Sequence, residues 1–452
     1  MLNFTESTSV VATFKGSKHM KKSNSNYVNV DQIQIGMFIE LDLGWMAHPF
    51  PTSSFKVTSQ KQIDTIAGLG LSRVRYAPDK SDPISPTPAA PSAAAPVLPG
   101  VASPLAPASP EAVYLSSLRK QQAGLLLAQQ RSLLVCERRF GEALRQYRKT
   151  VEQVASQPHS AAQQCSAMVS GFVSEMFEGQ SAIRLLTETA GEKSSMHTVN
   201  VTVISLLLGK ALGLSQADML DLGVASFLHD IGKVNLPDRV RWFDDNFTSA
   251  ETKAYQEHVW QGVQVGKSMG LSETAVLAIA QHHEMADGSG FPLRTQGENL
   301  ILIGQILALV NRYDNLCNPT RASSAHTPHE ALALIFSQFK ARFSPAVLGA
   351  FIRMMGVYPP GSVVQLADER FALVVSVNAS APQKPGVVVF DAATPPNQAL
   401  ILELEHAPNI SIRRSIKASS LPSAAVDYLA PRQRIAYFFE RVVDAALPKG
   451  AA

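Results

Sequence analysis

Five histidines and one aspartate in the middle of the chain have the residue types and the separation of a metal centre. They are drawn from 11 histidines in the whole sequence, and the set comprises His197, His229, Asp230, His258, His282 and His283. Imidazoles and a carboxylate on separate helices are what a metal site inside a helical bundle needs. A carboxylate has two oxygens, whereas a neutral imidazole has one free lone pair. Asp230 is therefore the natural bridge between two ions, and the sequence predicts two divalent metals.

The residues before and after Asp230 predict how it is positioned. An apolar run from Leu220 to Leu228 reads as a buried helix that delivers His229 and Asp230 to the interior. Lys233 follows three residues later, so it projects on nearly the same face if the helix persists. Pro237 then marks the end of the helix. Lys233 is expected to supply positive charge at a scissile phosphate, or to protonate a leaving oxygen.

His282 and His283 need a helix end. Neighbouring residues on a helix point about 100° apart, so both can reach one metal only where the helix stops. The run Asp287-Gly288-Ser289-Gly290-Phe291-Pro292 is a dense turn signal and supplies that end.

These motifs, in this order, resemble the HD-GYP subgroup of the HD-domain phosphohydrolases. The resemblance covers residues 194–321 and rests on the separated motifs His197, His229-Asp230-Ile231-Gly232-Lys233, His258 and His282-His283-Glu284, followed by residues 287–292. It implies an all-α bundle whose six matching positions hold two metals, iron or manganese, that activate water to attack phosphorus. It also implies that cyclic di-GMP is the substrate and linear pGpG the product.

The resemblance assigns further residues to the substrate. Lys233 matches the lysine that faces the phosphate, and Arg321 lies where the family often places a phosphate-binding arginine. Gly290 and Phe291 stand in the loop that gives the subgroup its name. Residues 30–76 resemble a small uncharacterised module that commonly precedes such domains, and this module could contact protein signalling partners.

Three departures from the family pattern bear on the metals. Phe291 keeps the aromatic ring of the usual tyrosine but loses its hydroxyl. Asn311 stands where an aspartate ligand is usual, and it is expected to give the first ion a neutral amide oxygen instead, while Asp314 is expected to face elsewhere. Lys193 replaces a glutamate that helps hold a third metal in some members, so two ions are expected rather than three. Asn311 also keeps open the alternative of a catalytically degenerate domain that binds a cyclic dinucleotide or a protein.

Some residues near the motifs keep two interpretations. Glu284 could equally hydrogen-bond a metal ligand or contact the substrate. Phe291 is expected to shape the loop rather than to stack on a base. The remaining histidines are expected to be unrelated to the metals; they are His19, His48, His159, His326, His329 and His406.

The rest of the chain sets the domain order. A polar N-terminus (1–26, expected to be disordered) precedes a small β-rich module (27–80) and a Pro/Ala-rich linker (81–110). A helical domain follows (111–358), with helical patterning that continues through residues 161–189 and on to about Ile352. A β-rich extension (359–452) ends in an expected helix from Arg432 to Ala446. The predicted fold class is mainly α, an HD-type bundle with two small β-rich parts.

Composition limits the partners. The formal net charge is +3, which gives no electrostatic case for a nucleic-acid polymer or a membrane surface. Three cysteines in 452 residues fit a reducing cytoplasm. No signal peptide and no apolar run of membrane-spanning length stands out, so a cytoplasmic protein is expected. The leucine-rich helical segment 111–156 could pair with a second copy to form a homodimer, or pack onto its own domain.

Overall fold

The computed structural model describes residues 26–41, 54–67, 71, 73–82, 110–187, 193–378 and 381–441. The chain divides into two compact units, 1–105 and 106–452, and each is described by itself. The expected disordered N-terminus and most of the expected linker lie outside the described residues.

The N-terminal unit is a small antiparallel sheet with one helix. Its four strands lie in the order β1-β4-β2-β3, and they are β1 (Asn26–Asn29), β2 (Phe38–Glu40), β3 (Ser54–Lys56) and β4 (Arg73–Tyr76). The helix α1 (Gln60–Ala67) contributes Ile66 to a core that also buries Ile39 and Val57. The β-rich character expected of residues 27–80 agrees with this sheet.

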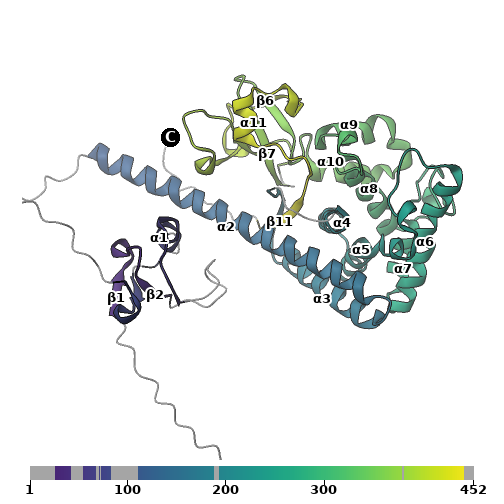
Figure 1. Cartoon of the computed structure of the whole chain (residues 1–452). Helices are drawn as coiled ribbons and strands as arrows, with labels where there is room; N and C mark the ends of the chain where they lie inside the picture. Colours follow the sequence, from purple (N-terminus) through teal and green to yellow (C-terminus); the bar gives the residue numbers. More distant parts are fainter. Residues whose placement is uncertain are drawn as a thin grey trace, which may run out of the picture. The chain divides into compact units, whose positions relative to one another are not determined.

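The C-terminal unit is mainly helical (Figure 1). Its helices are α2 (Pro110–Gln153), α3 (Pro158–Phe177), α4 (Lys193–Ala211), α5 (Gln216–Leu228), α6 (Ser249–Met269), α7 (Glu273–Gln281), α8 (Leu302–Cys317), α9 (Pro328–Gln338), α10 (Pro345–Met355) and α11 (Ser423–Leu429). Three of the helices around the site begin with a side chain that bonds a free backbone amide of the first turn. Ser215 caps α5, Ser272 caps α7, and Thr248 forms a reciprocal box with Glu251 at the start of α6. The starts of these three helices are therefore marked by local sequence signals.

A seven-stranded antiparallel sheet completes the same unit. The strands β10-β6-β7-β5-β11 form one path, and β8 and β9 extend from β7. They are β5 (Ser181–Leu185), β6 (Val363–Leu366), β7 (Phe371–Asn378), β8 (Gly386–Val389), β9 (Ile401–Glu403), β10 (Ile412–Ile416) and β11 (Tyr437–Arg441). Because β5 lies between β7 and β11, this sheet joins the helical domain to residues after 359, and both share one hydrophobic core.

Two secondary-structure predictions were wrong. The helical pattern expected across residues 161–189 is broken by β5, and the helix expected from Arg432 to Ala446 is replaced, within the described residues, by β11. Both strands are short apolar runs buried on both faces: Phe438 and Phe439 are adjacent and both are covered. Such runs lack the alternation that marks a half-exposed strand, and their periodicity does not separate them from buried helix.

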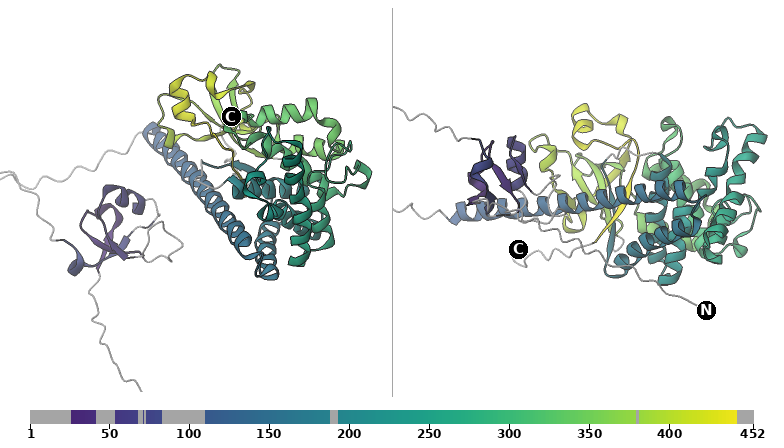
Figure 2. Two further views of the ribbon diagram at one scale, coloured as in Figure 1. Left: turned by 45° about the vertical axis from the view of Figure 1, so that its right-hand side comes forward. Right: turned by 60° about the horizontal axis from the view of Figure 1, so that its bottom comes forward.

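The helix α2 is one continuous element that runs along one side of the rest of the C-terminal unit (Figure 2). Its second half is part of the core, where Cys136, Phe140 and Leu144 are buried. Leu127 and Leu134, one heptad apart, are 42% and 63% exposed. The segment therefore packs on its own domain and also presents apolar side chains outward. Among the described residues, no helix combines the length and the apolar character needed to cross a bilayer.

Candidate metal centre

The end of α5 places Asp230 at the centre of the site. The helix stops at Leu228, and a 3-10 turn over Ile231–Asn235 follows, so the chain turns sharply just after Asp230. Gly232 lies against the backbone of α6: a Cβ there would come within 2.1 Å of the His258 carbonyl oxygen and 2.3 Å of the Gly262 nitrogen. Only glycine permits this approach, which brings His258 beside Asp230.

The structure brings six expected ligands together in two groups that share Asp230. His197 and His229 approach one carboxylate oxygen, with Nε2 atoms 3.9 and 3.5 Å from Oδ2. His258 and His282 approach the other, with Nε2 atoms 3.6 and 3.9 Å from Oδ1. His283 joins the second group, and within each group the candidate ligand atoms lie within 4.8 Å of one another. Each group could therefore hold one metal ion.

Hydrogen bonds on the far side of each ring fix which nitrogen faces the centre. His229 Nδ1 lies 2.7 Å from the Ser226 carbonyl oxygen, and the Nδ1 atoms of His258 and His282 each lie 2.6 Å from a carbonyl oxygen three residues earlier. A carbonyl only accepts, so each Nδ1 carries the proton and each Nε2 presents a lone pair. The Nε2 atoms of His258 and His282 are 3.2 Å apart. Two lone pairs at this distance repel each other unless a cation lies between them.

Burial keeps these imidazoles neutral. It lowers the pKa of His229 to about 4 and the pKa values of His258 and His282 to about 3. Burial alone would raise the pKa of Asp230, but the opposing positive charge, chiefly that of Lys233, holds this pKa well below its usual range. At neutral pH an ionised Asp230 thus lies beside the neutral imidazoles of His229, His258 and His282, which is the protonation state that metal binding requires.

Unsatisfied buried atoms support the fit to metal. Among the described residues, Asp230 Oδ1 and His283 Nε2 are buried without a hydrogen-bond partner. An orphaned carboxylate oxygen is costly to bury, and a bound cation would satisfy both atoms. A donor set of imidazoles with one carboxylate suits divalent transition metals.

The loop after α7 packs against a proposed ligand. The helix ends at Gln281, so His282 and His283 stand at a helix end, as their adjacency required. The ring of Phe291 stacks on His283 with centroids 4.4 Å apart. A Cβ on Gly290 would come within 2.5 Å of the His283 carbonyl oxygen, so this approach also needs glycine. The carboxylate of Glu284 accepts from the backbone amides of Leu293 and Thr295, so its observed bonds hold the loop rather than a metal ligand, and neither of its two interpretations is tested.

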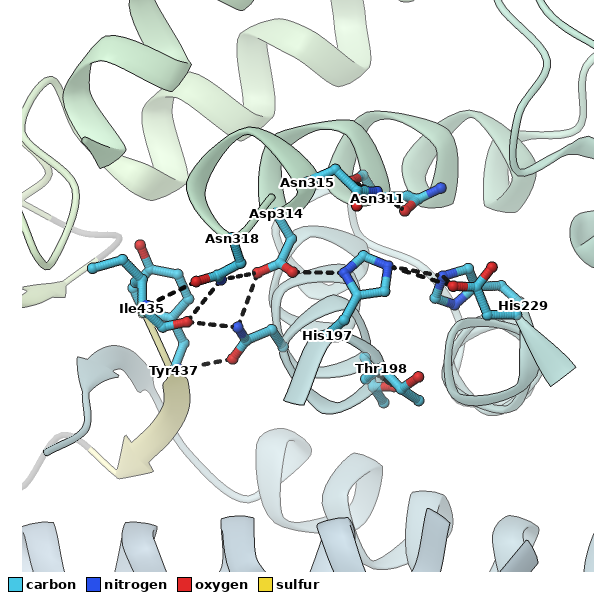
Figure 3. Close-up of polar contacts among 12 residues, drawn as sticks. His197, Thr198, His229, Asn311, Asp314, Asn315, Asn318, Ile435 and Tyr437 are labelled. Atoms are coloured by element: carbon cyan, nitrogen blue, oxygen red, sulfur yellow. Dashed lines mark hydrogen bonds and ion pairs between the residues drawn. The ribbon is translucent and has the colours of Figure 1, made fainter. Parts of the chain in front are cut away.

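Asp314 does not face elsewhere, and that prediction was wrong. Its Oδ2 lies 2.6 Å from His197 Nδ1, and its Oδ1 accepts 2.9 Å bonds from the side-chain amides of Asn200 and Asn318 (Figure 3). Residues three apart on a helix share a face, so the signal was present in the sequence. Asn311, one turn earlier on α8, turns its Oδ1 to the Asn315 amide at 2.7 Å. Asp314 therefore orients a ligand, while the oxygen of Asn311 is already engaged.

The remaining expected residues take other positions. Lys233 Nζ lies 2.6 Å from Asp230 Oδ2, where the carboxylate raises the pKa of the lysine above its ordinary value despite burial. Arg321 is half exposed and holds the carboxylate of Asp244. The side chain of Lys193 lies outside the described residues. The described histidines outside the two groups are His159, His326, His329 and His406, and His19 and His48 lie outside the described residues.

Two known families match successive stretches of the chain. Residues 180–347 match the family described as HD domain, and residues 26–165 match the domain of unknown function DUF3391. These matches confirm the expected resemblance: the chain carries an HD domain that follows a DUF3391 domain.

Curated relatives align with part of the chain. Cyclic di-GMP phosphodiesterase PA4108 of Pseudomonas aeruginosa is 28% identical over 214 residues, which cover 47% of this chain and 51% of the relative. The cyclic di-GMP phosphodiesterase response regulator RpfG of Xanthomonas campestris pv. campestris is 30% identical over 149 residues, covering 32% and 39%. The 3'3'-cGAMP-specific phosphodiesterase 2 of Vibrio cholerae is 28% identical over 163 residues, covering 36% and 31%. The chain thus spans about half or less of the length of these relatives.

A solved structure, Bd1817, a HDG"Y"P protein from Bdellovibrio bacteriovorus, also aligns with the chain. It covers 73% of this chain and 98% of its own, with a TM-score of 0.40 and 12% identity.

Proposed function

We propose that this chain is a metal-dependent phosphodiesterase that hydrolyses cyclic di-GMP to linear pGpG. The observation that carries the proposal is the buried carboxylate of Asp230, shared by two groups of inward-facing imidazoles. Two of the three curated relatives described above are named cyclic di-GMP phosphodiesterases, and the third is named for a related cyclic dinucleotide. This favours cyclic di-GMP as the substrate.

The proposed metal ions are two, iron or manganese. One would be held by His197, His229 and Asp230, and the other by Asp230, His258, His282 and His283. Bound ions of this kind activate water as a nucleophile and offset charge on phosphoryl oxygens. With Lys193 in place of an additional carboxylate, a third ion is not expected, and a single ring opening should leave pGpG as the product.

Lys233 is the proposed phosphate contact. Its side chain is 14% exposed, so it is largely covered, and its ammonium group lies 2.6 Å from Asp230 Oδ2. The ammonium group would stabilise the negative charge that grows on the phosphoryl oxygens, or it would donate a proton to the leaving oxygen. Gly290 and Phe291 are proposed to shape the substrate side of the second metal group through their packing on His283.

Arg321 receives a different role from the one expected. Both carboxylate oxygens of Asp244 accept from its Nη2 at 2.7 and 2.9 Å, so a phosphate contact would require this pair to break. We infer that Arg321 fixes the segment around Asp244 and does not bind phosphate itself.

A second candidate function is a degenerate domain that binds the cyclic dinucleotide without cleaving it. Asn311 favours it, because its amide oxygen bonds Asn315 and is neutral, which leaves the group around His197 with fewer charged ligands. Binding without turnover by metal-loaded protein would select this alternative.

The decisive experiment is hydrolysis of cyclic di-GMP by protein purified without oxygen and loaded with iron or manganese. We expect pGpG to accumulate, with two metal equivalents by elemental analysis. Asp230→Ala should be inactive while its circular dichroism stays that of the folded protein. Wild-type turnover in folded Asp230→Ala, or less than about a tenth of a metal equivalent after reconstitution, would contradict the proposal.

Three further expectations stay predictions: a cytoplasmic location, a homodimer formed through α2, and protein signalling partners for the N-terminal module.

A further inference from the structure

An exposed tryptophan lies beside Lys233 at the edge of the metal centre. Trp242 is 37% exposed, and Lys233 Nζ lies 5.6 Å from the centroid of its ring. The same Nζ lies 2.6 Å from Asp230 Oδ2. One ammonium group therefore contacts both the carboxylate between the two metal groups and a solvent-facing indole.

The segment that carries Trp242 is held on both sides. Before it, the Arg241 guanidinium donates to the carbonyl oxygens of Lys233 at 3.2 Å and of Leu236 at 3.0 Å. After it, Arg321 holds the carboxylate of Asp244. Four polar contacts thus fix a segment only four residues long, and the indole is positioned before any ligand arrives.

Aromatic rings continue from this segment to the proposed metal ligands. Phe243 is 46% exposed, and its ring centroid lies 5.5 Å from that of Tyr255. Tyr255 is buried, and its centroid lies 4.7 Å from that of His258. Two neighbouring large aromatic side chains therefore remain exposed next to the centre, where burying them on a ligand would be favourable.

We propose that Trp242 is a base-stacking residue that binds one base of a cyclic dinucleotide whose phosphate lies at Lys233. The proposal rests on the proposed function of the metal centre and names a part of its substrate site. Every nucleic-acid base has a planar face, and stacking on an aromatic side chain is the usual way in which proteins bind an unpaired base. The short distance from indole to ammonium suits a nucleotide, in which base and phosphate are joined by one sugar.

A competing role for Trp242 is only to hold Lys233 by a cation–π contact. The two roles predict different kinetics. Loss of a stacked base weakens substrate binding and raises KM, whereas a displaced Lys233 would act on the chemical step and lower kcat.

The test compares Trp242→Ala and Trp242→Phe with the wild-type chain, all metal-loaded and checked by circular dichroism. Trp260→Ala is the matched control, because Trp260 is 56% exposed on α6 and belongs to neither the segment nor the centre. We expect Trp242→Ala to raise KM for cyclic di-GMP about tenfold or more, as stacking of one base predicts, with kcat retained. Trp242→Phe should keep most of the affinity, and Trp260→Ala should match wild type. An unchanged KM, or a fall in kcat alone, would overturn the proposal.

If the wild-type chain does not hydrolyse cyclic di-GMP, the proposed function fails and the stacking proposal is judged by binding. Tryptophan emission is then followed while cyclic di-GMP is added to each metal-loaded protein. Quenching in wild type and Trp260→Ala that is lost in Trp242→Ala supports stacking. Equal quenching in Trp242→Ala, or no binding to wild type, overturns it.

Discussion

Replacement of Asp314 by asparagine tests whether the imidazole of His197 depends on its carboxylate. In the native site the carboxylate accepts the Nδ1 proton at 2.6 Å and leaves Nε2 with a lone pair 3.2 Å from His229 Nε2. An asparagine could still accept from Asn200 and Asn318 through one oxygen. Its amide nitrogen would then face His197 Nδ1, donor against donor. The ring would have to move its proton to Nε2, where it would block the metal.

The structure sets the size of the effect. His197 and Asp314 are both buried, so the lost interaction is a charge-assisted hydrogen bond worth about 1.5–3 kcal/mol. This corresponds to a weakening of metal affinity by about ten- to a hundredfold, the range found when a partner of a metal-ligating histidine is removed. The effect should fall on one ion only, because the ligands of the other ion are positioned by different groups: His258 by the Tyr255 carbonyl, His282 by the Ile279 carbonyl and His283 by the ring of Phe291.

Competition with a chromophoric chelator can resolve two binding steps in the metal-free protein. We expect Asp314→Asn to weaken one step and leave the other at its wild-type value. Asp221→Asn is the matched control, since that carboxylate on α5 accepts from Ser272. Two unchanged steps would refute the tautomer argument. An equal loss at both steps would show that the substitution disturbs the fold and not one ring.

Other predictions follow from neighbouring features. Asn311→Asp should tighten the weaker ion and raise activity, and a lower metal content than wild type would contradict it. Metal-free protein should unfold at lower temperature as the pH falls from 7 to 5. His229 and His258, with pKa values of about 4 and about 3, stay neutral when folded but gain protons near pH 6.5 when unfolded; a constant unfolding temperature would refute this. The double variant Leu127→Lys and Leu134→Lys should be monomeric by light scattering if α2 forms a dimer, and a wild-type chain that is already monomeric at micromolar concentration would exclude the dimer.

The sequence predicted those parts of the metal centre in which the chemistry allows only a few residue types. Adjacent histidines need a helix end, and the glycine-rich turn after them supplied one. The need for glycine at position 232 could not be predicted from the sequence. It arises from the close approach of Gly232 to His258, which depends on how α6 crosses the turn. Local requirements were therefore readable, and long-range approaches were not.

The two wrong secondary-structure predictions fall on segments whose conformation is decided by tertiary packing. β5 and β11 pair with each other although Arg184 and its partner Phe438 are 254 positions apart in the sequence, and nothing local in either strand indicates its partner. The same packing brings the carbonyl oxygen of Ile435 to the amides of Asn200 and Asn318. The C-terminal segment therefore supports His197 through these two amides, whereas the sequence predicted residues 359–452 only as a β-rich extension.

The two halves of the centre differ in what fixes their ligands, and this explains which ion should be the weaker. His229, His258 and His282 each give the Nδ1 proton to a backbone carbonyl three residues earlier, at Ser226, Tyr255 and Ile279. Side-chain substitution leaves such bonds in place. His197 alone among the four depends on a side chain, which is held in turn by Asn200, Asn318 and the strand that follows Ile435. The ion at His197 therefore lacks the charged ligand that an aspartate at position 311 would supply. Its ligand His197 also depends on a hydrogen-bond network that includes the C-terminal sheet. Changes in that sheet should therefore alter the affinity for this ion before they alter the affinity for the other ion.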